Sequence, residues 1–134
     1  MTRIVLDTNV LVSGMINPHG APGRIIDQIR EGRVELVVDD RILAEYTEVL
    51  HRPKFKRYFQ ANDVSDILMF LNQNVHYVVS TTHISDMPDA DDVPFLEVAI
   101  TAAVPLVTGN IVHFPEHYCE KIGMYVPADF LAQL

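Results

Sequence analysis

Short runs of hydrophobic residues alternate along the chain with longer stretches in which hydrophobic residues recur at helical spacing. The short runs predict strands over residues 3–6, 34–38, 75–79, 105–108 and 123–126. The longer stretches predict helices over residues 21–30, from 39 or 40 to about 51, from 62 or 63 onward, over about 93–103, and a terminal helical turn that opens at 127. Strands that alternate with helices in this way predict an α/β domain with a mostly parallel sheet.

Two parts of this pattern stay open. Residues 10–12 continue the hydrophobic character of the first strand, but two polar residues interrupt the run, so the pattern assigns residues 10–12 to no element. The start of the helix over about residues 93–103 is also open, because either Asp91 or Asp92 can cap it.

The length and composition fit one folded domain over residues 1–134. Hydrophobic residues make up 49% of the chain and charged residues 21%, as in ordinary globular proteins. The single cysteine cannot form an internal disulfide, and the hydrophobic runs are too short to cross a membrane. The N-terminus enters a strand pattern without the hydrophobic region of a signal peptide. We therefore expect a soluble, cytoplasmic protein, and the mean hydropathy of +0.13 favours a homodimer.

Charge is unevenly distributed along the chain. The net charge of −8 by itself argues against a passive nucleic-acid binder, which usually carries a basic surface. Four of the 10 basic residues nevertheless fall within residues 52–57, and four of the 18 acidic residues fall within residues 86–92. The chain therefore combines an acidic segment with a separate basic one.

Polar residues gather where the predicted strands end. Asp7 ends the first strand, Asn110 follows the fourth, and Asp92 lies at the start of the helix that leads into the fourth. Since ligand sites in parallel sheets lie at the carboxyl ends of the strands, these three residues can reach one edge of the sheet. Glu45 lies at the margin of the buried stripe of its helix, from where a carboxylate can point into a cleft.

Such a group of carboxylates has two interpretations. Clustered carboxylates repel one another unless they are protonated or bridged by cations, and their oxygens suit Mg²⁺ or Mn²⁺. Each residue alone also has an ordinary structural explanation: Asp7 as a turn residue, Glu45 as a solvated side chain, and Asp92 as a helix cap. Composition and spacing alone leave this choice open.

Four segments resemble, in order, the motifs of the PIN-domain family. Residues 4–13 resemble the opening motif, and residues 42–55 resemble the second motif of a subgroup of PIN-domain toxins. Residues 89–99 resemble the third motif, and residues 106–110 resemble the fourth. The four motifs in this order are highly specific, and they cover nearly the whole chain.

The resemblance implies a three-layer α/β/α fold around a central, mostly parallel sheet of about five strands. It also implies an endoribonuclease that depends on Mg²⁺ or Mn²⁺ and acts on RNA, often as the toxin of a toxin–antitoxin pair with a small antitoxin protein as partner. By matching position, Asp7, Glu45 and Asp92 are the acidic metal ligands and catalytic residues. Asn9 orients the Asp7 site, and Thr108 supports its fourth corner.

Asn110 departs from the family pattern, because many PIN-domain proteins have aspartate at this position. An amide can offer its carbonyl oxygen to a hard cation, but it brings no negative charge. This departure argues against a second, tightly held metal ion. Asp91 or Glu97 could supply the missing charge, and the sequence does not choose between them.

The basic segment over residues 51–59 interleaves cations with aromatic residues, a pattern suited to phosphate contacts combined with base stacking. A solvated turn with Phe55 and Phe59 packed inward explains the same pattern equally well. The candidate substrate-binding residues of this segment are Arg52, Lys54, Lys56 and Arg57.

Two other functions compete with a metal-dependent nuclease. An aspartyl-phosphate phosphatase of the haloacid-dehalogenase type would use Asp7 as nucleophile, but it requires a second aspartate where this chain has Asn9. A PIN-like module that is catalytically impaired through Asn110 would only bind RNA or a protein partner. Cleavage of RNA that requires a divalent ion distinguishes the nuclease from the binding module, and trapping of an aspartyl-phosphate analogue at Asp7 would identify the phosphatase.

Overall fold

A parallel sheet forms the centre of the protein, whose computed structural model describes residues 1–134. Its five strands pair in the order β3-β2-β1-β4-β5, and every neighbouring pair is parallel. The predicted sheet is therefore confirmed. The strands are β1 (Thr2–Leu6), β2 (Val34–Val38), β3 (Val75–Tyr77), β4 (Leu106–Val107) and β5 (Met124–Tyr125).

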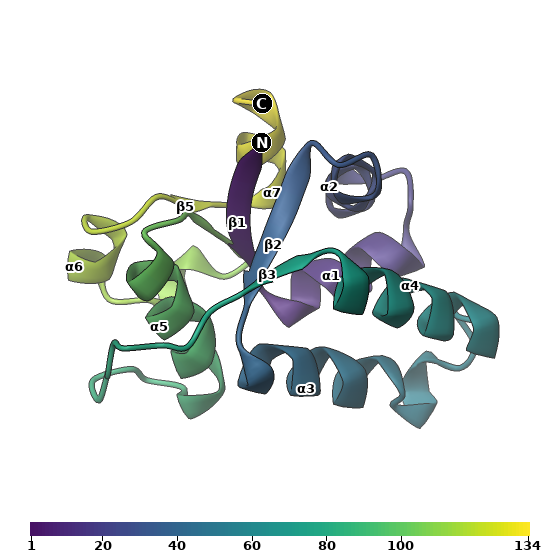
Figure 1. Cartoon of the computed structure of the whole chain (residues 1–134), viewed down its shortest axis with the longest axis horizontal. Helices are drawn as coiled ribbons and strands as arrows, with labels where there is room; N and C mark the ends of the chain where they lie inside the picture. Colours follow the sequence, from purple (N-terminus) through teal and green to yellow (C-terminus); the bar gives the residue numbers. More distant parts are fainter.

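Helices cover both faces of this sheet, as the three-layer prediction requires. The α-helices are α1 (Thr8–Ile16), α2 (Ala21–Arg30), α3 (Asp40–Leu50), α4 (Ala61–Gln73), α5 (Val93–Ala102), α6 (Glu116–Cys119) and α7 (Pro127–Ala132). Three short 3₁₀ helices join them: η1 (Pro53–Phe55), η2 (Ala90–Asp92) and η3 (Ile111–His113). Figure 1 shows α5 and α6 on one side of β1 and β2, and α1, α2 and α4 on the other. None of the helices has the length and hydrophobicity needed to cross a membrane.

The central strand β1 is the most enclosed part of the core. Its last three residues, Ile4, Val5 and Leu6, have no exposed surface, because strands flank them on both sides and helices lie above and below. They belong to a cluster of 32 buried hydrophobic residues. The residue that follows, Asp7, is the first polar side chain to leave this core at the carboxyl edge of the sheet.

The strand order places a crossover beside Asp7. The chain moves from β1 to β2 and β3 on one side, and later returns to β4 and β5 on the other side. Parallel α/β sheets bind their ligands at the carboxyl ends of the strands where the order reverses in this way. Leu6 pairs with Val107, so the next residues along the two strands, Asp7 and Thr108, come to lie side by side.

The main difference from the sequence prediction is helix α1. Residues 10–12 are helical, as part of Thr8–Ile16, and Asp7 caps this helix by accepting a hydrogen bond from the backbone N–H of Asn9. Most residues of α1 are buried, including Val10, Leu11 and Val12. The helix therefore lacks the regularly spaced polar residues that mark one face of a surface helix in the sequence. A buried helix segment of this kind is indistinguishable by periodicity from a buried strand.

The other differences are the short helix α6, which the sequence pattern does not predict, and the ends of elements. Helix α4 begins at Ala61, slightly earlier than predicted, because Gln60 and Asp63 form a capping box around its first turn. Strands β3, β4 and β5 are each shorter than predicted. Asp39 caps α3 by accepting a hydrogen bond from the backbone N–H of Ile42, as one of the two predicted alternatives requires.

Candidate active site

Asp7 is held at the end of β1 by a chain of hydrogen bonds. Its side chain is 7% exposed, and its Oδ2 accepts a hydrogen bond of 2.8 Å from the hydroxyl of the fully buried Thr108. The backbone N–H of Asn110 donates in turn to the hydroxyl oxygen of Thr108, over 3.1 Å. On the other side, the backbone N–H of Asn9 lies 3.4 Å from Oδ1 of Asp7. The carboxylate is therefore oriented by β4 and by the first turn of α1.

Glu45 approaches the same edge of the sheet from helix α3. The hydroxyl of Thr8, the residue after Asp7, donates a hydrogen bond to Oε2 of Glu45. The neighbouring Tyr46 is fully buried and donates from its hydroxyl to the backbone carbonyl of Leu6, over 2.5 Å. This bond ties α3 to the end of β1. It explains how a residue on a separate helix comes to lie beside Asp7.

The surroundings of Glu45 disfavour its charged form. Burial raises the pKa of Glu45, and the negative charges of Asp7 and Asp91 raise it further. The hydrogen bond from Thr8 and the positive charge of Arg52 act in the opposite direction. The pKa of Glu45 therefore depends on both the Asp7 carboxylate and Arg52, a cation of the basic segment.

Asp92 ends η2, directly before helix α5, where the simplest expectation was a helix cap. Its side chain makes no capping hydrogen bond, and its Oδ2 is buried without any hydrogen-bond partner. Burial raises the pKa of Asp92 from 3.8 to about 6, and the charges of Asp7, Asp89 and Glu45 add to this rise. A buried carboxylate oxygen without a donor is costly for folding, so a purely structural role does not explain Asp92.

The three predicted carboxylates therefore form one electrostatic cluster, built from β1, α3 and the start of α5. Asp7 and Glu45 both act on the pKa of Asp92, and Asp7 acts on that of Glu45. No group of three or more His, Cys, Asp or Glu side chains converges closely enough, as placed, to hold one metal ion jointly. Glu45 is instead turned toward Thr8, which satisfies one of its oxygens.

The structure separates the two candidates for compensating Asn110. Glu97 is 4% exposed and engaged elsewhere: its Oε1 pairs with Arg41 over 2.7 Å, and its Oε2 accepts from the backbone N–H of Ile84 over 2.8 Å. Asp91 is exposed, and its charge acts on Glu45. Only Asp91 is therefore placed to influence the carboxylate cluster.

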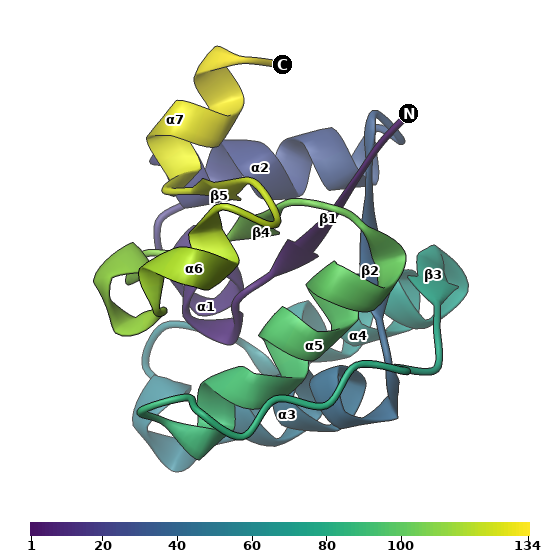
Figure 2. The same cartoon turned by 90° about the vertical axis from the view of Figure 1, so that its left-hand side faces the viewer.

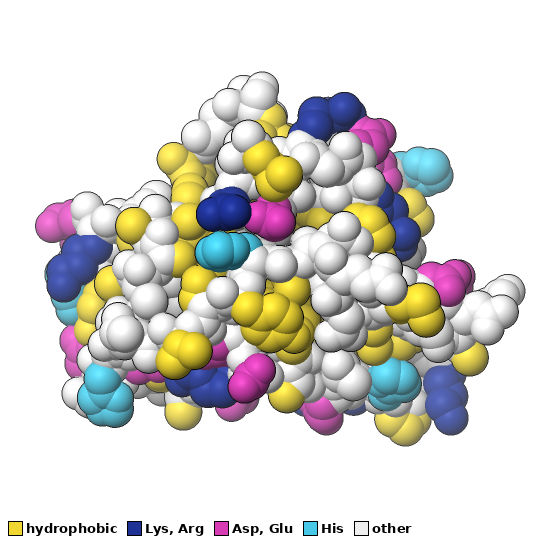
Figure 3. Space-filling model, viewed as in Figure 1, with side chains coloured by type: hydrophobic (Ala, Val, Ile, Leu, Met, Phe, Trp, Pro, Cys, Tyr) yellow, Lys and Arg dark blue, Asp and Glu magenta, His cyan; other side chains and the backbone are white.

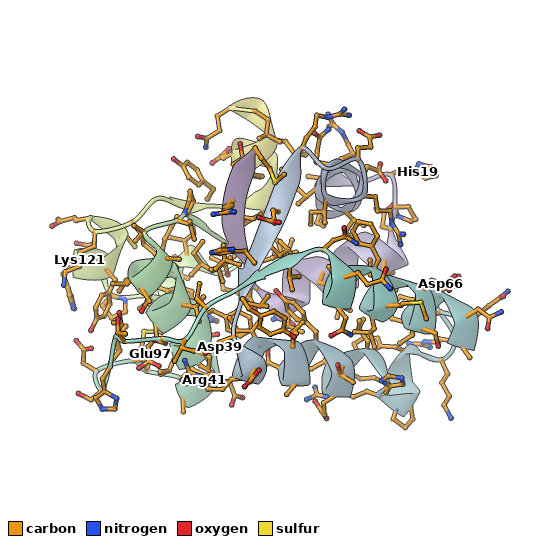
Figure 4. The ribbon with its side chains drawn as sticks, viewed as in Figure 1. His19, Asp39, Arg41, Asp66, Glu97 and Lys121 are labelled. Atoms are coloured by element: carbon orange, nitrogen blue, oxygen red, sulfur yellow. The ribbon has the colours of Figure 1, made fainter.

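The buried carboxylates of Glu97 and Asp39 share the exposed guanidinium of Arg41 in an ion-pair network. Arg41 also contacts Asp39 over 2.8 Å, so one guanidinium bridges the start of α3 and the middle of α5 (Figure 4). Hydrophobic patterning gives no signal for such a contact, because the residues lie 56 positions apart. The network fixes α5 against α3, and so it helps to position the two helices that carry Asp92 and Glu45.

The basic segment is partly packed and partly exposed. Phe59 is buried, and its ring lies 5.9 Å from that of Phe55, as the solvated-turn interpretation requires. The cations themselves stay exposed: Lys54 lies over the Phe55 ring and Arg57 over the Tyr58 ring. Their charges are thus accessible to a ligand, while the aromatic residues anchor the segment.

Arg52 connects the basic segment to the carboxylate cluster. Its guanidinium forms a two-pronged ion pair with Glu48, with distances of 3.2 and 2.9 Å. The pKa of Arg52 is raised first by this pair and further by the charges of Glu45 and Asp91. Arg52 is therefore coupled electrostatically to Glu45, one of the predicted site residues.

Comparison with known proteins agrees with this arrangement. The family model of the PIN domain matches residues 3–112, so the chain belongs to the PIN-domain family. The predicted resemblance is therefore confirmed, and PIN domains are generally nucleases that use divalent metal ions. The matched residues include the three candidate metal ligands, Asp7, Glu45 and Asp92, and also Asn110.

Two individual proteins are similar to this chain. The uncharacterised protein MJ1680 of Methanocaldococcus jannaschii is 31% identical over 109 residues, which cover 81% of this chain and 70% of the relative. The second is a chain in the crystal structure of VapBC2 from Rickettsia felis, which is bound to a DNA fragment from its promoter. It superposes on this chain with a TM-score of 0.55. That match is 14% identical and covers 92% of this chain and 97% of the other, so it supports the fold.

Proposed function

We propose that this protein is a metal-dependent endoribonuclease in which Asp7, Glu45 and Asp92 are the catalytic metal ligands. The observation that carries the proposal is the buried Oδ2 of Asp92, which lacks a hydrogen-bond partner and lies in the field of the other two carboxylates. A divalent cation would neutralise the repulsion and occupy the lone pairs of this oxygen. No hydrogen bond within the protein offers the same compensation.

The donor set fits a hard cation. Carboxylate oxygens with an adjacent amide suit Mg²⁺ or Mn²⁺, and the site contains neither cysteine nor a histidine pair. When bound, such an ion supplies activation of water and stabilisation of the charge that develops on the phosphorus oxygens. Asn110 supplies no charge, so the proposal requires one ion and makes a second position weak.

The protein's own side chains orient the ligands. The hydroxyl of Thr108 donates a hydrogen bond to Oδ2 of Asp7, and the backbone N–H of Asn9 donates to Oδ1. Thr8 holds Glu45 by its hydroxyl, so joint ligation requires the Glu45 side chain to turn away from Thr8. Asp91 adds negative charge at the rim and increases the attraction of the site for a cation.

The basic segment would hold the RNA backbone beside this acidic site. Because Arg52 is coupled electrostatically to Glu45, we assign to Arg52 the contact with the RNA phosphate nearest the scissile bond. Lys54, Lys56 and Arg57 are exposed farther along the same segment and would contact flanking phosphates. This arrangement accounts for substrate binding by a chain whose net charge is −8.

We further propose that the protein acts in the cytoplasm as the toxin of a toxin–antitoxin pair. Support comes from the fold shared with the VapBC2 structure and from the resemblance of residues 42–55 to PIN-domain toxins. A small antitoxin protein would then be its partner, and a homodimer would be its functional form. Purification of the chain together with the product of its neighbouring gene tests the pairing.

Incubation with a mixed RNA pool tests the activity itself. We expect cleavage with Mg²⁺ or Mn²⁺, no cleavage with chelator, and recovery when metal is restored. Asp92→Asn should abolish cleavage, whereas Asp66→Asn, which changes an exposed carboxylate on α4, should leave it intact. Cleavage that persists in chelator, or in Asp92→Asn, would overturn the assignment. A parallel incubation with single-stranded DNA establishes the preferred nucleic acid.

A second candidate function is a PIN domain that binds RNA or a protein without cutting it. It is favoured by the uncharged Asn110 and by the absence of a preassembled three-ligand group. RNA binding without cleavage in every metal, together with retention of the fold, would support this alternative. Cleavage that depends on metal and on Asp92 would exclude it.

A further inference from the structure

The outer edge of β3 is an open edge of the sheet. β3 is the terminal strand in the order β3-β2-β1-β4-β5, and it pairs only with β2. Figure 2 shows it at the margin of the molecule, with no helix or loop beyond it. Its free side therefore presents backbone hydrogen-bonding groups to a partner strand.

Backbone pairing shows which groups face outward. The N–H of Val78 bonds to the carbonyl of Val38 over 2.9 Å, so the extended chain stays parallel to β2 for one residue beyond the strand. In a parallel pair, residues alternate between those that bond to the neighbour and those that point away from it. Since Val78 bonds inward, the N–H groups of Tyr77 and Val79 point to the open side.

β3 is short, at three residues, but its edge lacks two other features by which proteins usually protect such strands. Residues 75–80 contain no lysine and no proline, which are the common protective residues at sheet edges. The side chains of Tyr77 and Val79 are 50% and 86% exposed, and hydrophobic surface is visible over this region in Figure 3. The opposite edge strand, β5, is only two residues long, and Pro127 follows it closely.

An acidic pocket lies beside the edge. Its volume is about 600 Å³, and it is lined by the end of β3, the following loop and the start of α3. The lining includes three carboxylates, those of Asp39, Asp40 and Glu97, and one guanidinium, that of Arg41. Arg41 already forms ion pairs with Asp39 and Glu97. Asp40 is exposed and forms no ion pair, so its charge is free to act on a ligand.

We propose that the outer edge of β3 binds an extended, basic segment of a partner polypeptide, which adds a strand beside Tyr77 and Val79 and places a lysine or arginine near Asp40. Backbone pairing supplies the affinity and the acidic pocket supplies the preference for positive charge. A second copy of this chain fits the edge less well, because each copy would bring the same acidic pocket and a net charge of −8. The proposal is independent of the nuclease assignment.

Binding of a labelled peptide of alternating valine and lysine tests this proposal by fluorescence anisotropy. We expect saturable binding to the full chain, and no comparable binding of the matched peptide of alternating valine and glutamate. Val79→Lys should weaken binding about tenfold or more, since it places a cation at the pairing edge. Asp40→Asn should weaken it about two- to fivefold, the range expected for one exposed ion pair.

Met69→Lys is the matched control, because Met69 is also a strongly exposed hydrophobic residue and the charge change is the same. It lies on α4 and should leave peptide binding unchanged, and Val79→Lys should leave any nuclease activity and the melting temperature unchanged. Equal binding of the acidic and basic peptides, or equal loss in Met69→Lys and Val79→Lys, would overturn the proposal. A dimer in sedimentation that dissociates on Val79→Lys would overturn it too, by identifying a second copy as the occupant.

Discussion

The hydroxyl of Thr108 donates a hydrogen bond of 2.8 Å to Oδ2 of Asp7, across 101 positions of the chain. The bond exists because β1 and β4 pair in parallel with Leu6 opposite Val107, which brings the first residue after each strand together. It leaves Asp7 with a fixed orientation beside Asp92 and Glu45.

Replacement of Asp7 by asparagine should abolish RNA cleavage and preserve the fold. The metal-free variant should be as stable as the parent protein or melt a few degrees higher, because one of three mutually repelling charges is gone. The same change should lower the pKa of Asp92 toward its ordinary value, since Asp7 is among the charges that raise it. Asp66→Asn serves as the control, and full activity of Asp7→Asn would refute the metal-site assignment.

The stability of the metal-free protein should fall as pH rises from about 4 to above 6. The pKa of Asp92 is about 6 in the folded protein and 3.8 as its ordinary value, so the folded state retains the proton over this interval while the unfolded state loses it. Folding is therefore relatively favoured below the interval and loses this advantage above it. Denaturant unfolding at several pH values measures the slope, and Asp92→Asn should flatten it. An unchanged slope in the variant would assign the pH dependence to other groups.

Thr108→Val should reduce kcat about 10- to 100-fold, the usual cost of removing a group that orients a metal ligand. Valine keeps the volume of the buried side chain but leaves Oδ2 of Asp7 without its donor. Thr108→Ser should recover most of the activity, because serine retains the hydroxyl. Full activity of Thr108→Val would show that cleavage does not need the hydrogen bond to Asp7.

Asn110→Asp should increase the affinity for Mn²⁺ or Mg²⁺. The substitution adds a charge near the cluster, where the present amide contributes only a dipole. The backbone N–H that donates to Thr108 is retained, so the support of Asp7 is undisturbed. Calorimetric titration of both proteins measures the change. If affinity and activity are the same in both, Asn110 lies outside the metal shell.

Combined Lys54→Ala and Lys56→Ala substitutions should weaken RNA binding and flatten its salt dependence by roughly one unit or a little more, at about 0.7 per phosphate contact for single strands. The value of kcat at saturating RNA should change little, because the contacts are equal in ground and transition states. Arg24→Ala with Lys121→Ala serves as control, because it removes the same charge from exposed residues outside the basic segment. An unaltered salt slope would leave the segment as a solvated turn. A lower kcat with unchanged KM would place one of these lysines nearer the reacting phosphate.

The sequence by itself determined the order of elements and the identity of the carboxylates. Alternating strand and helix patterns predicted the parallel sheet, since strands buried on both faces read as continuous hydrophobic runs such as residues 4–6. The motif resemblance selected Asp7, Glu45 and Asp92; in the structure Asp7 and Glu45 raise the pKa of Asp92, and Asp7 raises that of Glu45. The sequence pattern could not reveal α1, because a helix that is buried on most sides lacks the polar face by which a helical period is recognised.

Only the tertiary structure decided what surrounds these residues. Asp92 has the sequence features of a helix cap, but in the folded chain its Oδ2 is buried without a hydrogen-bond partner. Glu97 was a candidate for the site until its pairing with Arg41 placed it in a separate network. Such contacts join residues far apart in the chain, and their partners depend on strand register and helix packing, which local sequence patterns do not encode.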